Sequence, residues 1–125
     1  MTLPALRDDA LRTIDGATQV RLSLPWIRSL PLASLIDPAV SIDGAPGEPT
    51  IVLGSRRIAP EALADEEGWW YLQDRVVLEL PDAATPGIHD VAVSFRLEIP
   101  YLPGGGGGPL RLPFAVARQL GTDAA

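Results

Sequence analysis

At 125 residues the chain has the length of one folded domain, so we treat residues 1–125 as a single unit. It contains no cysteine, which excludes disulfides and thiolate metal sites, and its formal net charge of −6 argues against nucleic acid as a partner. No apolar run reaches the roughly 18 residues of a membrane span, and Arg7, Asp8 and Asp9 stand where a signal peptide is apolar, so we expect no membrane attachment and a cytoplasmic location.

Alternating apolar residues predict four β-strands in the first half of the chain. Two of them are followed by Asp15-Gly16 and Asp43-Gly44, dipeptides that accept the positive φ of tight hairpin turns. Gly54-Ser55 reverses the chain once more. Hairpins of this kind imply antiparallel pairing. The four predicted strands are residues 10–14, 18–24, 40–42 and 51–53.

One short helix is predicted after these strands, at residues 60–65. Pro60 suits the first helical turn because the N–H that it lacks would have no partner there, and Glu61 interacts favourably with the positive end of the helix. Thirteen prolines and twelve glycines leave little room for another helix.

The apolar alternation continues in the second half and is clearest in residues 90–99, where one face is apolar and the other mixed. Pro113 lacks a ladder donor, so we place the last strand at a sheet edge or a bulge. Gly104–Gly108 is a flexible connection before that strand, either a surface loop or a lid near a partner's active site, and residues 121–125 form a frayed tail. The predicted strands are residues 76–80, 90–99 and 110–116.

These elements predict an all-β fold, a small antiparallel β-sandwich of immunoglobulin-like or jelly-roll-like type with at most one short helix. The chain offers few groups for catalysis within such a fold. His89 is the only histidine, and Asp90 beside it points to the opposite face of a strand, which disfavours a hydrogen-bonded base and orienting acid. The acidic run at residues 65–67 is typical of a solvated face. We therefore expect no catalytic residue, no metal site and no cofactor in this chain.

The three tryptophans indicate a binding surface instead. The apolar positions of the predicted strands are filled by Val, Leu, Ile and Phe, and the tryptophans lie outside the interiors of these strands. In Trp69-Trp70-Tyr71 the alternation of side chains places Trp69 and Tyr71 on one side and Trp70 on the other, so one of the two tryptophans belongs to the core. The other anchors a protein partner, stacks on a sugar ring or caps an open sandwich end. The predicted partner interface consists of Pro25, Trp26, Arg28, Leu30, Trp69, Trp70, Gln73, Asp74 and Tyr101.

Several segments resemble, in order and spacing, the small beta subunits of C-glycoside deglycosidases. Pro25-Trp26-Ile27-Arg28 and Trp69-Trp70-Tyr71 are among them, and the match spans roughly residues 8–120. The segments that carry it are residues 20–32, 41–44, 69–74, 86–91 and 97–101.

The resemblance implies a two-component carbon–carbon lyase that acts on 3-oxo-glucosides, for example oxidised flavonoid C-glycosides. It implies a larger TIM-barrel alpha subunit that holds the general base and a divalent metal, Mn or Mg, while the beta subunit is a non-catalytic sandwich bound to the barrel. Two other interpretations stay open: a free-standing carbohydrate-binding sandwich with Trp26 or Trp70 as its stacking platform, and the beta subunit of a related lyase acting on 3-oxo O-glycosides.

Overall fold

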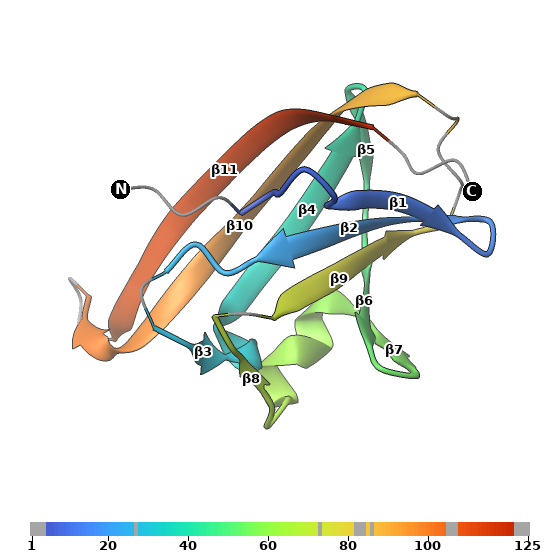
Figure 1. Ribbon diagram of the computed structural model, residues 1–125. Coiled ribbons are helices and arrows are strands. Elements are labelled where there is room, and N and C mark those ends of the chain that lie inside the picture. The colour runs from blue at the N-terminus through green and yellow to red at the C-terminus, as the bar shows by residue number, and fades with distance from the viewer. Residues whose placement is uncertain are drawn as a thin grey trace.

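The fold is a sandwich of two antiparallel β-sheets (Figure 1), seen in a computed structural model that describes residues 5–26, 28–72, 74–81, 85, 87–104 and 108–121. One sheet has the strand order β1-β2-β9-β6-β7 and the other β11-β10-β4-β5. This confirms the predicted all-β fold. The first sheet consists of β1 Leu11–Ile14, β2 Ala17–Ser23, β9 Arg75–Leu80, β6 Thr50–Leu53 and β7 Arg56–Ile58, and the second of β11 Pro109–Gly121, β10 Ile88–Pro103, β4 Leu35–Ile42 and β5 Ala45–Gly47.

Short elements close one end of the sandwich. β3 (Leu30–Pro31) pairs with β8 (Trp69–Trp70) as a separate two-stranded sheet. Two 3₁₀ segments lie near it in sequence, η1 (Leu32–Ser34) and η2 (Pro60–Asp65). The second occupies the predicted helix, with Pro60 in its first turn, whereas the three-residue η1 was not predicted.

The hairpin turns follow the predicted chemistry. Asp15 and Gly16 have φ values of 50° and 78°, and Asp43 and Gly44 have 52° and 82°. Positive φ at both central residues gives the turn a twist that matches the twist of the strands it joins. The third turn has Gly54 at φ 63° between β6 and β7.

The C-terminal hairpin is longer than predicted. β10 extends to Pro103 and pairs with β11 up to Pro109, and the backbone N–H of Gly104 donates to the carbonyl of Gly108 at 2.7 Å. β11 is an edge strand, which confirms the placement of Pro113. Gly121, predicted to begin the tail, is the last residue of β11, and the rest of that tail lies outside the described residues.

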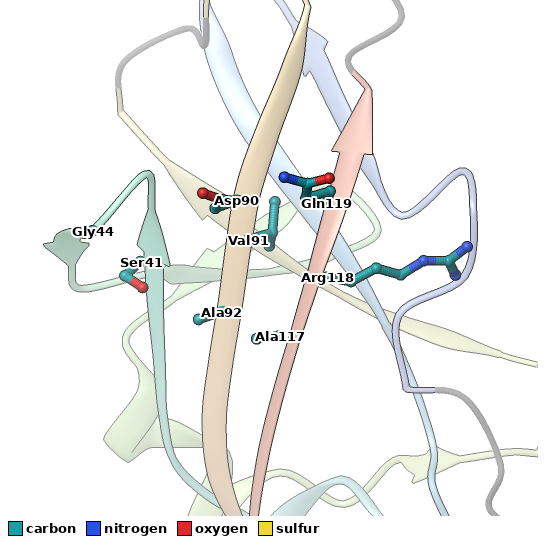
Figure 2. Close-up of a pocket in the computed structure, with 8 residues that line it drawn as sticks. All are labelled: Ser41, Gly44, Asp90, Val91, Ala92, Ala117, Arg118 and Gln119. Atoms are coloured by element: carbon teal, nitrogen blue, oxygen red, sulfur yellow. The ribbon is translucent and has the colours of Figure 1, made fainter.

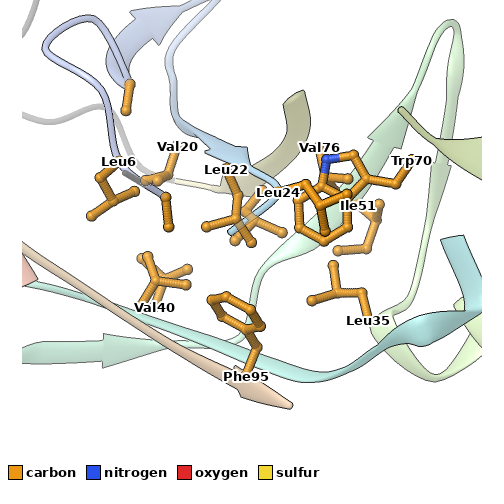
Figure 3. Packing of buried hydrophobic residues seen from close by; sticks show 14 of the residues in the cluster. Leu6, Val20, Leu22, Leu24, Leu35, Val40, Ile51, Trp70, Val76 and Phe95 are labelled. Carbon is orange, nitrogen blue, oxygen red and sulfur yellow. The ribbon is translucent and has the colours of Figure 1, made fainter. Parts of the chain in front are cut away.

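Apolar side chains from both sheets fill the space between them (Figure 3). The alternation predicted for residues 90–99 is present, since Val91, Val93 and Phe95 are buried while Ser94 and Arg96 are exposed. Phe95 also stacks on Phe114 of β11, with ring centroids 5.4 Å apart. Trp70 belongs to the same core. The burial of Trp70 in this core therefore holds β8 against the end of the sandwich.

Candidate functional site

The pairing of β3 with β8 joins the two tryptophan-containing segments of the sequence. Leu30 is registered with Trp70 and Pro31 with Trp69. The contact extends on both sides, because Leu32 N–H donates to the Gly68 carbonyl at 3.0 Å and Leu72 N–H donates to Ser29 Oγ at 3.0 Å. Segments about 40 residues apart in sequence thus form one surface at the end of the sandwich (Figure 1).

The two adjacent tryptophans have opposite environments. Trp70 is 1% exposed and donates its indole N–H to the Asp74 carbonyl at 3.2 Å, whereas Trp69 is 52% exposed. This confirms that one of the pair belongs to the core. Leu30 is also fully buried, so the side chains of Leu30 and Trp70, both predicted for the interface, support the surface from below instead of lying on it. Burial also removes Trp70 as a stacking platform for sugars.

Tyr101 of β10 joins this surface from a third part of the chain. Its hydroxyl accepts a hydrogen bond from the indole N–H of Trp26 at 2.6 Å. The guanidinium carbon of Arg28 lies 5.6 Å from the centre of the Tyr101 ring, which is the geometry of a cation–π contact. Tyr101 therefore contacts both Trp26 and Arg28, and all three were predicted for the interface, although Trp26 and Tyr101 are 75 positions apart.

Exposed apolar side chains are concentrated at this end. Seven large apolar residues are exposed among those described, and five of them lie in two short stretches, residues 69–72 and 101–102. The other two, Ile14 and Ile88, lie elsewhere. We call the group the aromatic end; it consists of Trp26, Arg28, Trp69, Tyr71, Leu72, Tyr101 and Leu102.

Of the remaining predicted interface residues, two lie next to the aromatic end in sequence and one lies outside the described residues. Pro25 is half-buried and precedes Trp26, and Asp74 is exposed just after the aromatic end. Gln73 lies outside the described residues. Leu72 and Leu102 were not predicted, because an exposed leucine gives no sequence signal unless its neighbours are known to be exposed as well.

The outer face of the five-stranded sheet, in contrast, is covered by its own polar side chains. Gln19 accepts from Arg12 Nε at 2.8 Å and donates to Glu79 at 2.8 Å, and Arg57 Nε donates to Glu79 at 2.8 Å. The hydrogen bonds from Arg57 and Gln19 hold the pKa of Glu79 below its usual value. The charges around Glu79 are therefore already neutralised within this part of the sheet.

A hollow lies on the four-stranded sheet, away from the predicted residues (Figure 2). It is a shallow depression of about 460 Å³ over β4, β10 and β11. Small side chains such as Ala92 and Ala117 form it, and its arginine, Arg118, donates to the Leu6 carbonyl at 2.9 Å and is paired with Asp8. The depression holds no arrangement of an acid, a base and a nucleophile.

His89 takes part in a structural link at the other end of β10. Its Nδ1 lies 2.6 Å from Asp43 Oδ2 and its Nε2 lies 2.6 Å from the Thr85 carbonyl oxygen. The other oxygen of Asp43 accepts from Asp90 N–H at 2.9 Å. The hydrogen bonds to Asp43 and to the Thr85 carbonyl raise the pKa of His89, and the same bond to His89, followed by that from Asp90 N–H, lowers the pKa of Asp43.

This geometry favours a structural role for the histidine. Both ring nitrogens are directed at oxygen acceptors, so the protonated imidazolium, which donates from both, satisfies the site. His89 is buried and Asp90 is exposed, as the opposite faces of a strand require. The link joins the β4–β5 turn to the start of β10.

Other classes of site have no support in the part of the chain that the structure describes. No group of three or more His, Cys, Asp or Glu side chains there has the arrangement of a metal site. Among the same residues, no helix has both the length and the apolar character needed to cross a membrane.

Comparison with known proteins gives three similar chains of matching length. The chain is 37% identical over 98 residues to the C-glycoside deglycosidase beta subunit of Arthrobacter globiformis, covering 74% of this chain and 75% of the relative. It is 31% identical over 101 residues to the 3'-dehydrocarminate deglycosidase beta subunit of a Microbacterium species, covering 76% of each. It is 30% identical over 102 residues to the C-glycoside deglycosidase beta subunit of Microbacterium trichothecenolyticum, covering 78% of each. No protein-family model matches the chain.

Proposed function

Because the chain belongs to the family of C-glycoside deglycosidase beta subunits, we propose that it is the non-catalytic subunit of a heteromeric C-glycoside deglycosidase and binds a larger subunit through its aromatic end. One observation carries the choice of surface: five of the seven exposed large apolar side chains among the described residues gather there. Aromatic side chains are enriched at the centres of protein interfaces, where each removes about 150–250 Å² from water.

The proposed partner is an alpha subunit with a TIM-barrel fold. It supplies the general base, and a divalent metal, Mn or Mg, stabilises negative charge that develops on the substrate. The proposed substrate is a glucoside oxidised at the sugar's 3-position, where the ketone acidifies the adjacent C–H so that a base can remove its proton. The relative named for 3'-dehydrocarminate supports a 3-dehydro sugar. Cleavage then releases the aglycone by breaking its carbon–carbon bond to the sugar.

In this division of labour the beta subunit shapes and shields the pocket. It contributes an apolar surface that excludes water from the pocket of the larger subunit. The internal contacts of the aromatic end suit such a role, since Tyr101 is held by Trp26 and Arg28 before any partner arrives. Side chains that are already ordered lose less conformational entropy on binding.

Co-expression with a candidate larger subunit tests the proposal. We expect the two to co-purify in a fixed ratio and to cleave a 3-oxo C-glucoside together, with neither subunit active alone. A chain that elutes as a free monomer in the presence of the larger subunit would contradict it. Parallel assays with a 3-oxo O-glucoside decide between the two bond types.

The exposed indole of Trp69 also gives the carbohydrate-binding interpretation one candidate platform. Titration of the isolated chain with glucose and with C-glucosides distinguishes the two functions. Saturable binding that Trp69→Ala abolishes supports the sugar-binding module, and absence of binding supports the subunit.

A further inference from the structure

A groove lies beside Trp69, at the junction between the aromatic end and the five-stranded sheet. Its volume is about 290 Å³. Its lining combines aliphatic side chains of β6 and β9 with the Trp69 indole, and two charged residues stand at its edge. The lining residues that matter here are Leu32, Val52, Leu53, Val77, Trp69 and Asp74.

The two charged residues of the groove differ in whether their charge is neutralised. Arg75 donates to Asp9 Oδ1 at 2.6 Å, so its guanidinium is already occupied. Asp74 makes no side-chain hydrogen bond or ion pair with any residue in the described ranges, and neither does Glu67, two positions before Trp69. Exposed carboxylates therefore stand on both sides of Trp69 in the sequence.

The arginines of the chain do not provide a cation for Asp74 or Glu67. Eight of the ten donate to an oxygen within the chain, and Arg28 lies over Tyr101. The chain has sixteen acidic and ten basic residues, so an excess of carboxylates is left for solvent or a partner. Charge complementarity at interfaces pairs such carboxylates with basic side chains.

We propose that this groove receives a segment of the larger subunit in which an apolar side chain is followed or preceded by a lysine or arginine. The apolar side chain rests on Val52, Val77 and the Trp69 indole, and the cation pairs with Asp74. This inference rests on the proposed function, because the groove shares Trp69 with the aromatic end.

A protein segment fits the groove better than a sugar does. A monosaccharide needs several hydrogen-bonding groups around its ring, and the aliphatic floor of this groove provides none. Its charged side chains are Asp74 and Arg75, of which Arg75 is occupied by Asp9. A protein segment with an apolar side chain beside a cation can contact the aliphatic floor and pair with the Asp74 carboxylate at the same time.

The test measures the affinity of the purified larger subunit for four variants of this chain. Trp69→Ala removes the wall of the groove, and Asp74→Arg reverses the charge at its edge. The matched controls are Ile88→Ala, at the most exposed large apolar residue among those described, and Glu48→Arg, which changes the net charge by the same amount at an exposed position elsewhere. Unfolding curves verify that all four fold like the wild type.

We expect Trp69→Ala to weaken binding about thirtyfold and Asp74→Arg about tenfold, with both controls within twofold of the wild type. The affinity of the wild type should fall as salt is raised, and that of Asp74→Arg should change less. If the wild type binds the larger subunit and both groove variants bind equally well, the groove is not the docking site, although the proposed function stands.

Two further results separate the possibilities. Ala115→Arg places a charge on the exposed face of the four-stranded sheet. Loss of binding in this variant, with Trp69→Ala unchanged, would assign the interface to that sheet and overturn the inference. If the wild type itself does not bind the larger subunit, the proposed function fails together with the inference.

Discussion

The two adjacent tryptophans should separate stability from binding. Trp70 is 1% exposed, so its removal loses nearly all of its buried area, about 150–250 Å². At about 25 cal/mol per Å² this is roughly 4–6 kcal/mol, and Trp→Ala changes in cores cost about 3–5 kcal/mol. A domain has a total free energy of unfolding of about 5–15 kcal/mol, so Trp70→Ala should remove a large part of it.

Trp69→Ala should behave differently, because half of that side chain already faces water. We expect a loss of about 1 kcal/mol or less in the isolated chain. The assay is urea unfolding of the isolated chain, followed by far-ultraviolet circular dichroism because fluorescence changes when an indole is removed. Trp70→Phe, which keeps a ring, serves if Trp70→Ala does not fold. Equal losses of stability in Trp69→Ala and Trp70→Ala would refute the assignment of one indole to the core and the other to the surface.

Three further predictions concern local contacts. The pKa of His89 is raised in the folded chain, so its link to Asp43 stabilises the fold fully below pH 6.5, the pKa of the histidine in the unfolded chain. This contribution is lost as the pH rises through the pKa of the folded state. Asp43→Asn should therefore flatten that part of a plot of unfolding free energy against pH. Gly44→Ala, at φ 82°, should lower the unfolding free energy by about 1 kcal/mol in urea titrations, and no loss would mean that the turn relaxes. Tyr101→Phe removes the acceptor for the Trp26 indole and should lower it by about 1 kcal/mol, whereas an unchanged value would mean that water replaces the hydroxyl.

The long strands could be predicted because their burial is one-sided. In residues 90–99 each apolar side chain is followed by a small or polar one, and a half-buried strand is the structure that gives this period. Turn positions were equally clear, since Asp15 and Asp43 each precede a glycine and both adopt positive φ. Pro113 has no N–H to donate, so it limited the last strand to a sheet edge or a bulge, and the structure shows the edge.

The details of the aromatic end depend on contacts that sequence patterns do not encode. β3 and β8 have two residues each, too few for any periodicity, and their pairing is decided by the core beneath Leu30 and Trp70. The alternation in Trp69-Trp70-Tyr71 shows that the two indoles point apart but not which one points inward. The contact of Trp26 with Tyr101 spans 75 positions, so it follows from the packing of the whole sandwich.

Other unpredicted features have the same origin. His89 meets Asp43 across 46 positions of sequence, at a place where the turn after β4 reaches the start of β10. The registers of β4 and β10 shift between Ser94 and Arg96, opposite Asp37, which has a φ of 49°. A β-bulge of this kind depends on how two strands pair, so the sequence of either strand alone does not predict it.

Amide hydrogen exchange of the chain, alone and bound to the larger subunit, tests the central claim most directly. If the aromatic end is the docking surface, peptides that cover residues 68–72 and 100–103 should exchange more slowly in the complex, while the β1–β2 turn around Asp15 is unchanged. Unchanged exchange in both peptides, with new protection on the outer face of β10 and β11, would contradict it.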